Sequence, residues 1–177
     1  KARGIEVLFL YEPVDEYVMN NLREYEEKTL VSADQGDLKL DEVPQSSEES
    51  LSEDEGNALC SWLKETIGER VKEVKISERL VDSPAMALTP DAMSSQMRRM
   101  MQQMGQPGMP TEVLFEINPR HTLMKNLNTQ RETNPDLAKL IALQAFDNSM
   151  VAAGLLEDPK DMVSRMYDIL SQASETK

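Results

Sequence analysis

The sequence contains hardly any cysteine or histidine, since Cys60 and His121 are the sole examples among 177 residues. A single cysteine forms no intramolecular disulfide, which is typical of a reducing compartment. One residue of each kind also does not supply the ligands of a cysteine–histidine metal site. Because nothing in their spacing indicates a nucleophilic pair, we predict no catalytic, cofactor-binding or metal-binding residue. The rival hypothesis is an enzyme that uses His121 with nearby carboxylates.

Both residues have simpler interpretations. Cys60 lies close to Trp62 on a predicted helix, where a small buried side chain is expected. His121 follows Asn118-Pro119-Arg120 at a junction between strand and helix, which favours a turn or capping role.

Basic residues are scarce as well: 19 Lys and Arg stand against 32 Asp and Glu, for a net charge of -13. This balance argues against a nucleic-acid binder and against attraction to an anionic membrane. No apolar run approaches the roughly 20 residues that cross a bilayer. Between positions 34 and 55, nine acids with Lys39 as the one base predict a solvated linker, and a specific acidic docking tail is the alternative.

The hydrophobic pattern predicts a mixture of strands and helices. The chain begins with Lys1 and enters an apolar run within a few residues, which suggests that it is a fragment of a longer protein. Any targeting signal would then lie outside this fragment. Residues 5–11, 14–25 and 28–32 read as a strand, a helix and a strand joined as a crossover unit. A capping-box pair, Ser52 and Glu55, starts a helix that ends near Gly68. Further strands at 71–76, 80–88 and 113–117 would form a small antiparallel sheet covered by that helix.

Three helices are expected after this sheet. A short one passes through Leu123 and Leu127. A longer one begins at Asn134-Pro135 and stops at Gly154, and the last begins at 158–161.

Methionine is abundant, with twelve residues, and five of them form one helical stripe between Thr89-Pro90 and Gly105. These are Met93, Met97, Met100, Met101 and Met104, at offsets of 0, 4, 7, 8 and 11. A core-facing helix is the simpler interpretation. A stripe made of methionine at every position instead favours a mobile arm that contacts many partners, because the side chain is flexible and polarisable.

The helix at 137–153 is apolar around most of its circumference and must therefore be buried. Two helices joined by a short linker do not bury that surface alone, but a second copy would, by forming a four-helix bundle across a two-fold axis. Packing against the chain's own sheet is the alternative. The predicted interface comprises Leu137, Leu140, Ile141, Phe146, Met150, Val151, Leu155, Leu156, Met162, Met166, Ile169 and Leu170.

Several ordered motifs resemble the heat-shock protein 90 chaperones from end to end. GIEVL (4–8), DEY (15–17), LREY (22–25) and KTLVS (28–32) look like the end of their middle domain. GERVKEV (68–74), RL (79–80), SPAM (83–86), EINPRH (116–121) and AAGLLEDP (152–159) look like their C-terminal domain. The chain is most similar to the bacterial and mitochondrial branches, because it ends in SETK and not in the Glu-Glu-Val-Asp tail of the eukaryotic cytosolic branch.

The resemblance implies an α+β fold, with the tail of an α/β middle domain over 1–40, an acidic linker over 41–55 and a dimerisation domain over 56–177. The dimerisation domain would carry a mobile Met-rich helix at 90–104 and end in the two-helix dimerisation motif. The parent would be an ATP-dependent, stress-related chaperone that binds ATP with Mg in a domain absent here. This segment would then be no enzyme and hold no cofactor.

The resemblance also implies partners and a compartment. The chain would pair with itself and bind unfolded client proteins, through the methionine stripe together with Glu16, Tyr17 and Asn20. The alternative is a pure dimerisation scaffold whose Met-rich helix packs as core. We expect no nucleic acid and no membrane partner, and a location in the bacterial cytoplasm or, alternatively, the mitochondrial matrix.

Overall fold

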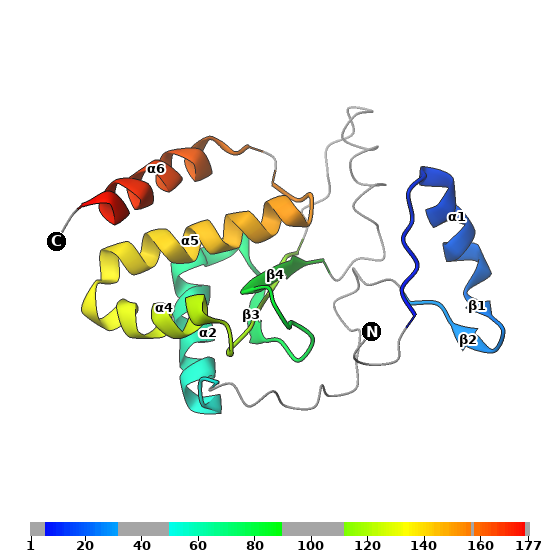
Figure 1. The fold of residues 1–177 in the computed structure, drawn as a ribbon, viewed down its shortest axis with the longest axis horizontal. Helices are drawn as coiled ribbons and strands as arrows, with labels where there is room; N and C mark the ends of the chain where they lie inside the picture. Colours follow the sequence, from blue (N-terminus) through cyan, green and yellow to red (C-terminus); the bar gives the residue numbers. More distant parts are fainter. Residues whose placement is uncertain (1–5, 32–49, 90–111, 157, 176–177) are drawn as a thin grey trace.

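The computed structural model describes residues 6–31, 50–89, 112–156 and 158–175. Strands and helices are mixed along the chain, which confirms the predicted α+β class (Figure 1). In chain order they are α1 (Pro13–Leu22), β1 (Glu24–Tyr25), β2 (Lys28–Thr29), α2 (Glu53–Ile67), the 3-10 turn η1 (Gly68–Arg70), β3 (Glu73–Ile76), β4 (Ala85–Leu88), β5 (Leu114–Ile117), α4 (Thr122–Thr133), α5 (Pro135–Ala152) and α6 (Lys160–Ser174). The predicted linker and Met-rich helix lie outside the described residues, apart from 50–55.

The three-stranded sheet has the order β3-β5-β4, so the last strand along the chain lies in the middle. β4 pairs antiparallel to β5, as predicted, but β3 pairs parallel to it, with Val74 opposite Phe115. The prediction of a wholly antiparallel sheet was therefore wrong for β3. β5 separates the two strands that were expected to be neighbours, and both of its edges are hydrogen-bonded along their length.

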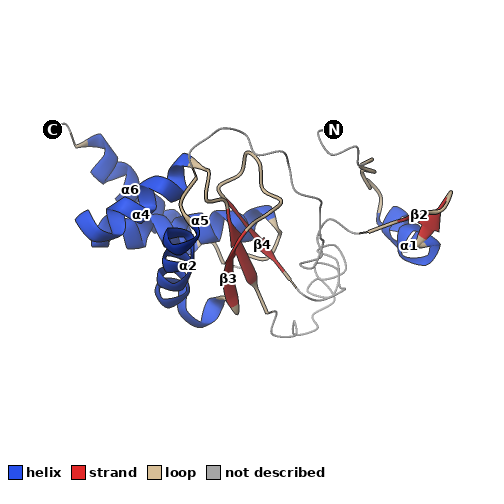
Figure 2. Ribbon diagram, turned by 90° about the horizontal axis from the view of Figure 1, so that it is seen from below, coloured by secondary structure: helices blue, strands red, loops and turns tan. Residues whose placement is uncertain are grey.

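Helices α2 and α5 pack on one face of this sheet, α2 against β3 and α5 against β4 (Figures 1 and 2). The interior between them contains the fully buried side chains of Leu59 and Leu63 from α2, Phe115 and Ile117 from β5, and Phe146 from α5. Burying this much apolar surface is the main stabilising contribution. The sheet was expected to be covered by α2 alone, and α5 completes the cover.

The N-terminus of α2 has the predicted capping box. The Ser52 hydroxyl accepts a hydrogen bond from the Glu55 backbone N–H, and the Glu55 carboxylate accepts bonds from the Ser52 hydroxyl at 2.7 Å and from its N–H at 2.9 Å. These two bonds from Ser52 hold the pKa of the Glu55 carboxyl below its usual value.

Local signals also place the ends of α4 and α5. Nδ1 of His121 accepts a hydrogen bond from the Leu123 N–H at 3.0 Å, so His121 is the N-cap of α4, in agreement with the predicted capping role. The side chain of Asn134 caps α5 by accepting from the Leu137 N–H. Gly154 follows α5 with φ +68°, a conformation that favours glycine.

The N-terminal segment differs from the prediction. Residues 6–11 form no strand, and β1 and β2 form a two-residue hairpin instead of the second arm of a crossover unit. The reason lies in Glu26 and Glu27, which have φ of +48° and +64° and make the tight primed turn that reverses the chain at once. The apolar side chains of Val7 to Tyr11 are exposed.

Candidate dimerisation surface

Helix α6 packs against α5 and has no buried residue of its own. Its partly buried side chains Met162, Arg165 and Ile169 share the face that turns toward α5. Acidic and hydroxyl side chains occupy the part of the circumference next to Arg165, namely Asp161, Ser164, Asp168 and Ser171. α5 therefore covers a single edge of the helix.

An exposed apolar stripe occupies the rest of the circumference of α6, on the side turned away from α5. The stripe consists of Val163, Met166, Tyr167 and Leu170, which are exposed by 41%, 38%, 64% and 54%. Their spacing of 0, 3, 4 and 7 residues places them on one side of a helix. A contiguous apolar surface of this kind is typical of a protein–protein contact.

A buried carboxylate links α6 to the body of the domain. Asp147 of α5 is 2% exposed, and its Oδ2 accepts a hydrogen bond at 2.7 Å from Nη1 of Arg165 on α6. Its other oxygen, Oδ1, is paired with Nη2 of Arg70, which ends η1. Both oxygens of one carboxylate are thus paired with guanidinium groups from different elements, and we call these three residues the Asp147 cluster.

The Asp147 cluster is continuous with the core. The Arg70 guanidinium lies over the ring of Phe146, 4.9 Å from its centroid, in a cation–π contact. The Phe146 ring in turn meets the Phe115 ring edge to face. The position of α6 is therefore linked, through Arg70 and α5, to the centre of the sheet.

The predicted interface residues fall into three groups. Phe146 is fully buried inside its own chain. Val151, Met166 and Leu170 are exposed. The others are partly buried, namely Leu137, Leu140, Ile141, Met150, Leu155, Leu156, Met162 and Ile169. The prediction did not include Val163, Tyr167, Arg165 or Asp147, although an aspartate within so apolar a helix is a signal for a buried partner of opposite charge.

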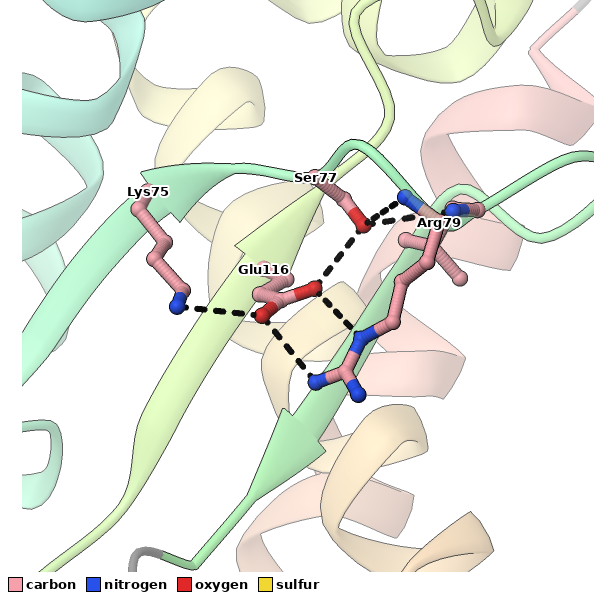
Figure 3. Close-up of polar contacts among 5 residues, drawn as sticks. Lys75, Ser77, Arg79 and Glu116 are labelled. Atoms are coloured by element: carbon pink, nitrogen blue, oxygen red, sulfur yellow. Dashed lines mark hydrogen bonds and ion pairs between the residues drawn. The ribbon is translucent and has the colours of Figure 1, made fainter. Parts of the chain in front are cut away.

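A second buried carboxylate lies on the sheet (Figure 3). Glu116 of β5 is 4% exposed and accepts two hydrogen bonds of 3.0 Å from Arg79 and one of 2.8 Å from the Ser77 hydroxyl, with Lys75 at 3.3 Å. The same hydroxyl accepts bonds from the N–H groups of Arg79 and Leu80. This network fixes the segment after β3 onto the central strand.

The two residues considered for catalysis lie in structural positions. Cys60 is in the core cluster, and burial raises the pKa of its thiol to about 11. Such a thiol stays protonated near neutral pH and is a poor nucleophile. His121 caps α4 through Nδ1. Over the described ranges no group of three or more His, Cys, Asp or Glu is placed to hold a metal ion.

Comparison with known proteins identifies the family. The model of the Hsp90 protein family matches residues 1–177. The chain belongs to the Hsp90 family. It is 46% identical to the chaperone protein HtpG of Desulfitobacterium hafniense over 98% of its own length. It is 38% identical to the mitochondrial heat shock protein 75 kDa of Rattus norvegicus over 99%, and 36% identical to HtpG of Desulfotalea psychrophila over 98%.

These relatives confirm the predicted resemblance to the bacterial and mitochondrial Hsp90 branches. The chain spans 28% of the length of the Desulfitobacterium relative and 26% of the rat relative. It therefore corresponds to about a quarter of each of these longer proteins. Among the helices described here, none is long and apolar enough to cross a membrane.

Among the client-binding residues expected from the Hsp90 resemblance, Tyr17 has a side chain within the described part of the structure. Tyr17 lies on α1 and is 72% exposed. Glu16 and Asn20 belong to the same helix, but their side chains lie outside the described part of the structure. The methionine stripe from Met93 to Met104 also lies outside it.

Proposed function

We propose that this chain is the homodimerisation part of an ATP-dependent Hsp90-type chaperone and carries part of its client-binding surface. The observation that carries the dimer is the exposed apolar stripe of α6, Val163, Met166, Tyr167 and Leu170. Val151 at the end of α5 is exposed as well, so apolar surface is present on both helices.

A second copy related by a two-fold axis is the occupant that best fits this surface. In an isologous contact the same stripe meets itself, so two pairs of α5 and α6 form a four-helix bundle. The alternative is burial of this surface within one chain. The core of the chain is, however, already covered by the opposite side of α5, where Ala138, Ala142 and Phe146 are buried. Phe146 thus supports the interface from beneath and does not enter it.

The solution mass tests the dimer. Light scattering from about 1 to 100 μM should give twice the 20.0 kDa of one chain throughout. Leu170→Asp places a charge in the stripe and should raise the dissociation constant about 100-fold or more. Ser164→Asp adds the same charge on the polar face of α6 and is the matched control. A wild-type monomer, or equal effects of the two variants, would contradict the proposal.

Client binding is proposed for the methionine stripe with Glu16, Tyr17 and Asn20. Each copy offers one weak apolar surface, and the dimer gains by presenting two. Met97→Asp with Met101→Asp should abolish suppression of aggregation of a heat-unfolded test protein, while the dimer mass stays unchanged. Gln102→Asp with Gln103→Asp, off the stripe, is the control.

The competing function is a pure dimerisation scaffold whose Met-rich helix packs as core. It predicts slow trypsin cleavage at Arg98 and Arg99 and loss of thermal stability in the double methionine variant. An exposed arm predicts rapid cleavage and an unchanged melting temperature. Trypsin proteolysis at low enzyme ratio therefore separates the two functions. Cleavage within 41–55 by a glutamate-specific protease, for which this acidic segment offers sites, would support the proposed division into 1–40 and 56–177.

The nucleotide chemistry is assigned to the parent protein and not to this segment. We propose that ATP with Mg binds upstream in the full-length chaperone, and that the chain acts in the bacterial cytoplasm, with the mitochondrial matrix as the alternative. Isothermal titration with Mg-ATP should show binding to the full-length protein and none to this segment. Heat of binding from the segment alone would overturn this assignment.

A further inference from the structure

We propose that Asp147 is a positioning residue, and that its pairing with Arg165 sets the rotation of α6 about its own axis so that the exposed stripe faces away from α5. The inference rests on the proposed dimerisation, because that stripe is the surface presented to the second copy. It adds a residue that selects which side of α6 is presented.

The apolar surface of α6 is broader than its contact with α5 requires. At 100° per residue, Met162 and Ile169 lie within about 60° of Arg165, whereas Val163, Tyr167 and Leu170 lie about 140° to 200° from it. Met166 lies between the two groups. The apolar arc is therefore continuous, and either half has the composition to pack on α5.

Apolar packing does not choose between these two rotations, because it is not directional. A hydrogen-bonded ion pair is directional, and Arg165 lies at one edge of the apolar arc. Its guanidinium reaches Oδ2 of Asp147 at 2.7 Å only when the Met162–Ile169 half turns toward α5. Buried polar pairs are known to select one packing register among several, and this pair has the geometry to do so.

The two arginines of the Asp147 cluster differ in their freedom to move. The Arg70 side chain is 44% exposed, whereas the Arg165 side chain is 11% exposed. If Asp147 loses its charge, Arg70 can turn toward water without moving the backbone. Arg165 regains water only when α6 rotates or lifts from α5. Loss of the Asp147 charge therefore changes the position of α6, while the sheet and α2 retain their packing.

Hydrogen exchange of the α6 amides tests this inference together with the dimer dissociation constant. Asp147→Asn and Arg165→Met should each raise exchange in 160–174 about tenfold and weaken the dimer about 10- to 100-fold. Lys160→Met is the matched control, because its pair with Asp158 at 3.5 Å is exposed and should change neither quantity. Arg165→Lys keeps the charge and should restore most of the affinity.

The core has its own reporter in Trp62 of α2, the single tryptophan. In the Asp147 and Arg165 variants, the free energy of unfolding followed by Trp62 fluorescence should change much less than the free energy of opening that amide exchange reports for α6. If Asp147→Asn does not fold, Asp147→Leu combined with Arg165→Leu removes both charges and keeps an apolar contact. This double variant should fold but dimerise more weakly than wild type, and wild-type affinity in it would overturn the proposal.

Failure of this inference is distinguishable from failure of the dimer proposal. In a Leu170→Asp background the stripe is disrupted while Arg165 and Asp147 remain, so exchange in α6 reports the pairing in a monomer. Faster exchange on adding Asp147→Asn to that background supports the positioning role. Unchanged exchange overturns it, even if the wild-type chain is a dimer.

Discussion

Phe115 of β5 and Phe146 of α5 meet edge to face, with ring centroids 5.3 Å apart and ring planes at 85°. This geometry is the favourable one for two aromatic quadrupoles. It joins the central strand to the helix that carries Asp147, and it leaves a face of the Phe146 ring for the Arg70 guanidinium. The core contact and the charged cluster therefore share one side chain.

The Glu116 network should contribute strongly to stability. In Glu116→Gln, the nearly buried Arg79 loses the carboxylate that pairs with it, so we expect a loss of about 3 kcal/mol in the free energy of unfolding. Urea denaturation followed by Trp62 fluorescence measures it at fixed protein concentration. Glu112→Gln is the control, because its ion pair with Lys72 is exposed and should be worth less than about 1 kcal/mol. Equal losses would show that burial of Glu116 does not matter.

The cap formed by His121 should depend on an acceptor and not on the imidazole as such. His121→Ala leaves the Leu123 N–H without its partner and should cost about 1 kcal/mol in the free energy of unfolding. His121→Asp supplies a carboxylate acceptor at the positive end of α4 and should recover most of that loss. Thermal unfolding by circular dichroism compares the three proteins, and an aspartate variant no better than alanine would contradict the capping role.

Gly56 should show a specific coupling with Ile76. A Cβ added at Gly56 would lie 2.7 Å from Cδ1 of Ile76 and 3.3 Å from its Cγ1. Gly56→Ala alone should therefore forgo the gain of about 1 kcal/mol that alanine usually brings to a helix.

The variant Ile76→Val removes the Cδ1 atom and makes room for the new methyl group. The double variant should be more stable than the sum of the two single effects predicts, by about 1 kcal/mol in a denaturation cycle. Simple additivity would mean that the side chain of Ile76 moves aside without cost.

Cys60 should make stability depend on alkaline pH. Its pKa is raised to about 11 by burial, so the folded state holds the proton more tightly than the unfolded chain does. The stabilising effect is complete below the usual thiol value and is lost as the pH rises from about 9 to about 11. The difference between wild type and Cys60→Ala isolates this contribution, and parallel pH curves would contradict it. Iodoacetamide should also alkylate the native thiol slowly at pH 8.

Several local features were predictable because their signals lie within a few residues of one another. Ser52 and Glu55 are three positions apart, Asn134 directly precedes Pro135, and Gly154 follows the last apolar turn of α5. Each acts on backbone groups of its own helix end, so the sequence alone contains the physical cause. The excess apolar surface of the last two helices was predictable for the same reason, since hydrophobic periodicity is a local property of the sequence.

The remaining features depend on residues that are distant in the chain. The parallel pairing of β3 with β5 and the central place of β5 follow from which strand edges meet in space. The hairpin at Glu26 and Glu27 is local, but it was missed because its two positive φ angles are adopted by residues other than glycine. Phe146 was expected in the interface because a helical period does not tell which partner covers a face.

Neighbouring residues alone indicate the family, the α+β class, the capped ends of α2, α4 and α5, and the excess apolar surface of the C-terminal helices, because motifs, caps and hydrophobic periodicity are local properties of a sequence. Which side of that apolar surface is covered depends on how the helices pack in three dimensions. Arg70, Asp147 and Arg165 come from three separate elements, and the burial of one carboxylate between two guanidinium groups exists only once those elements have packed.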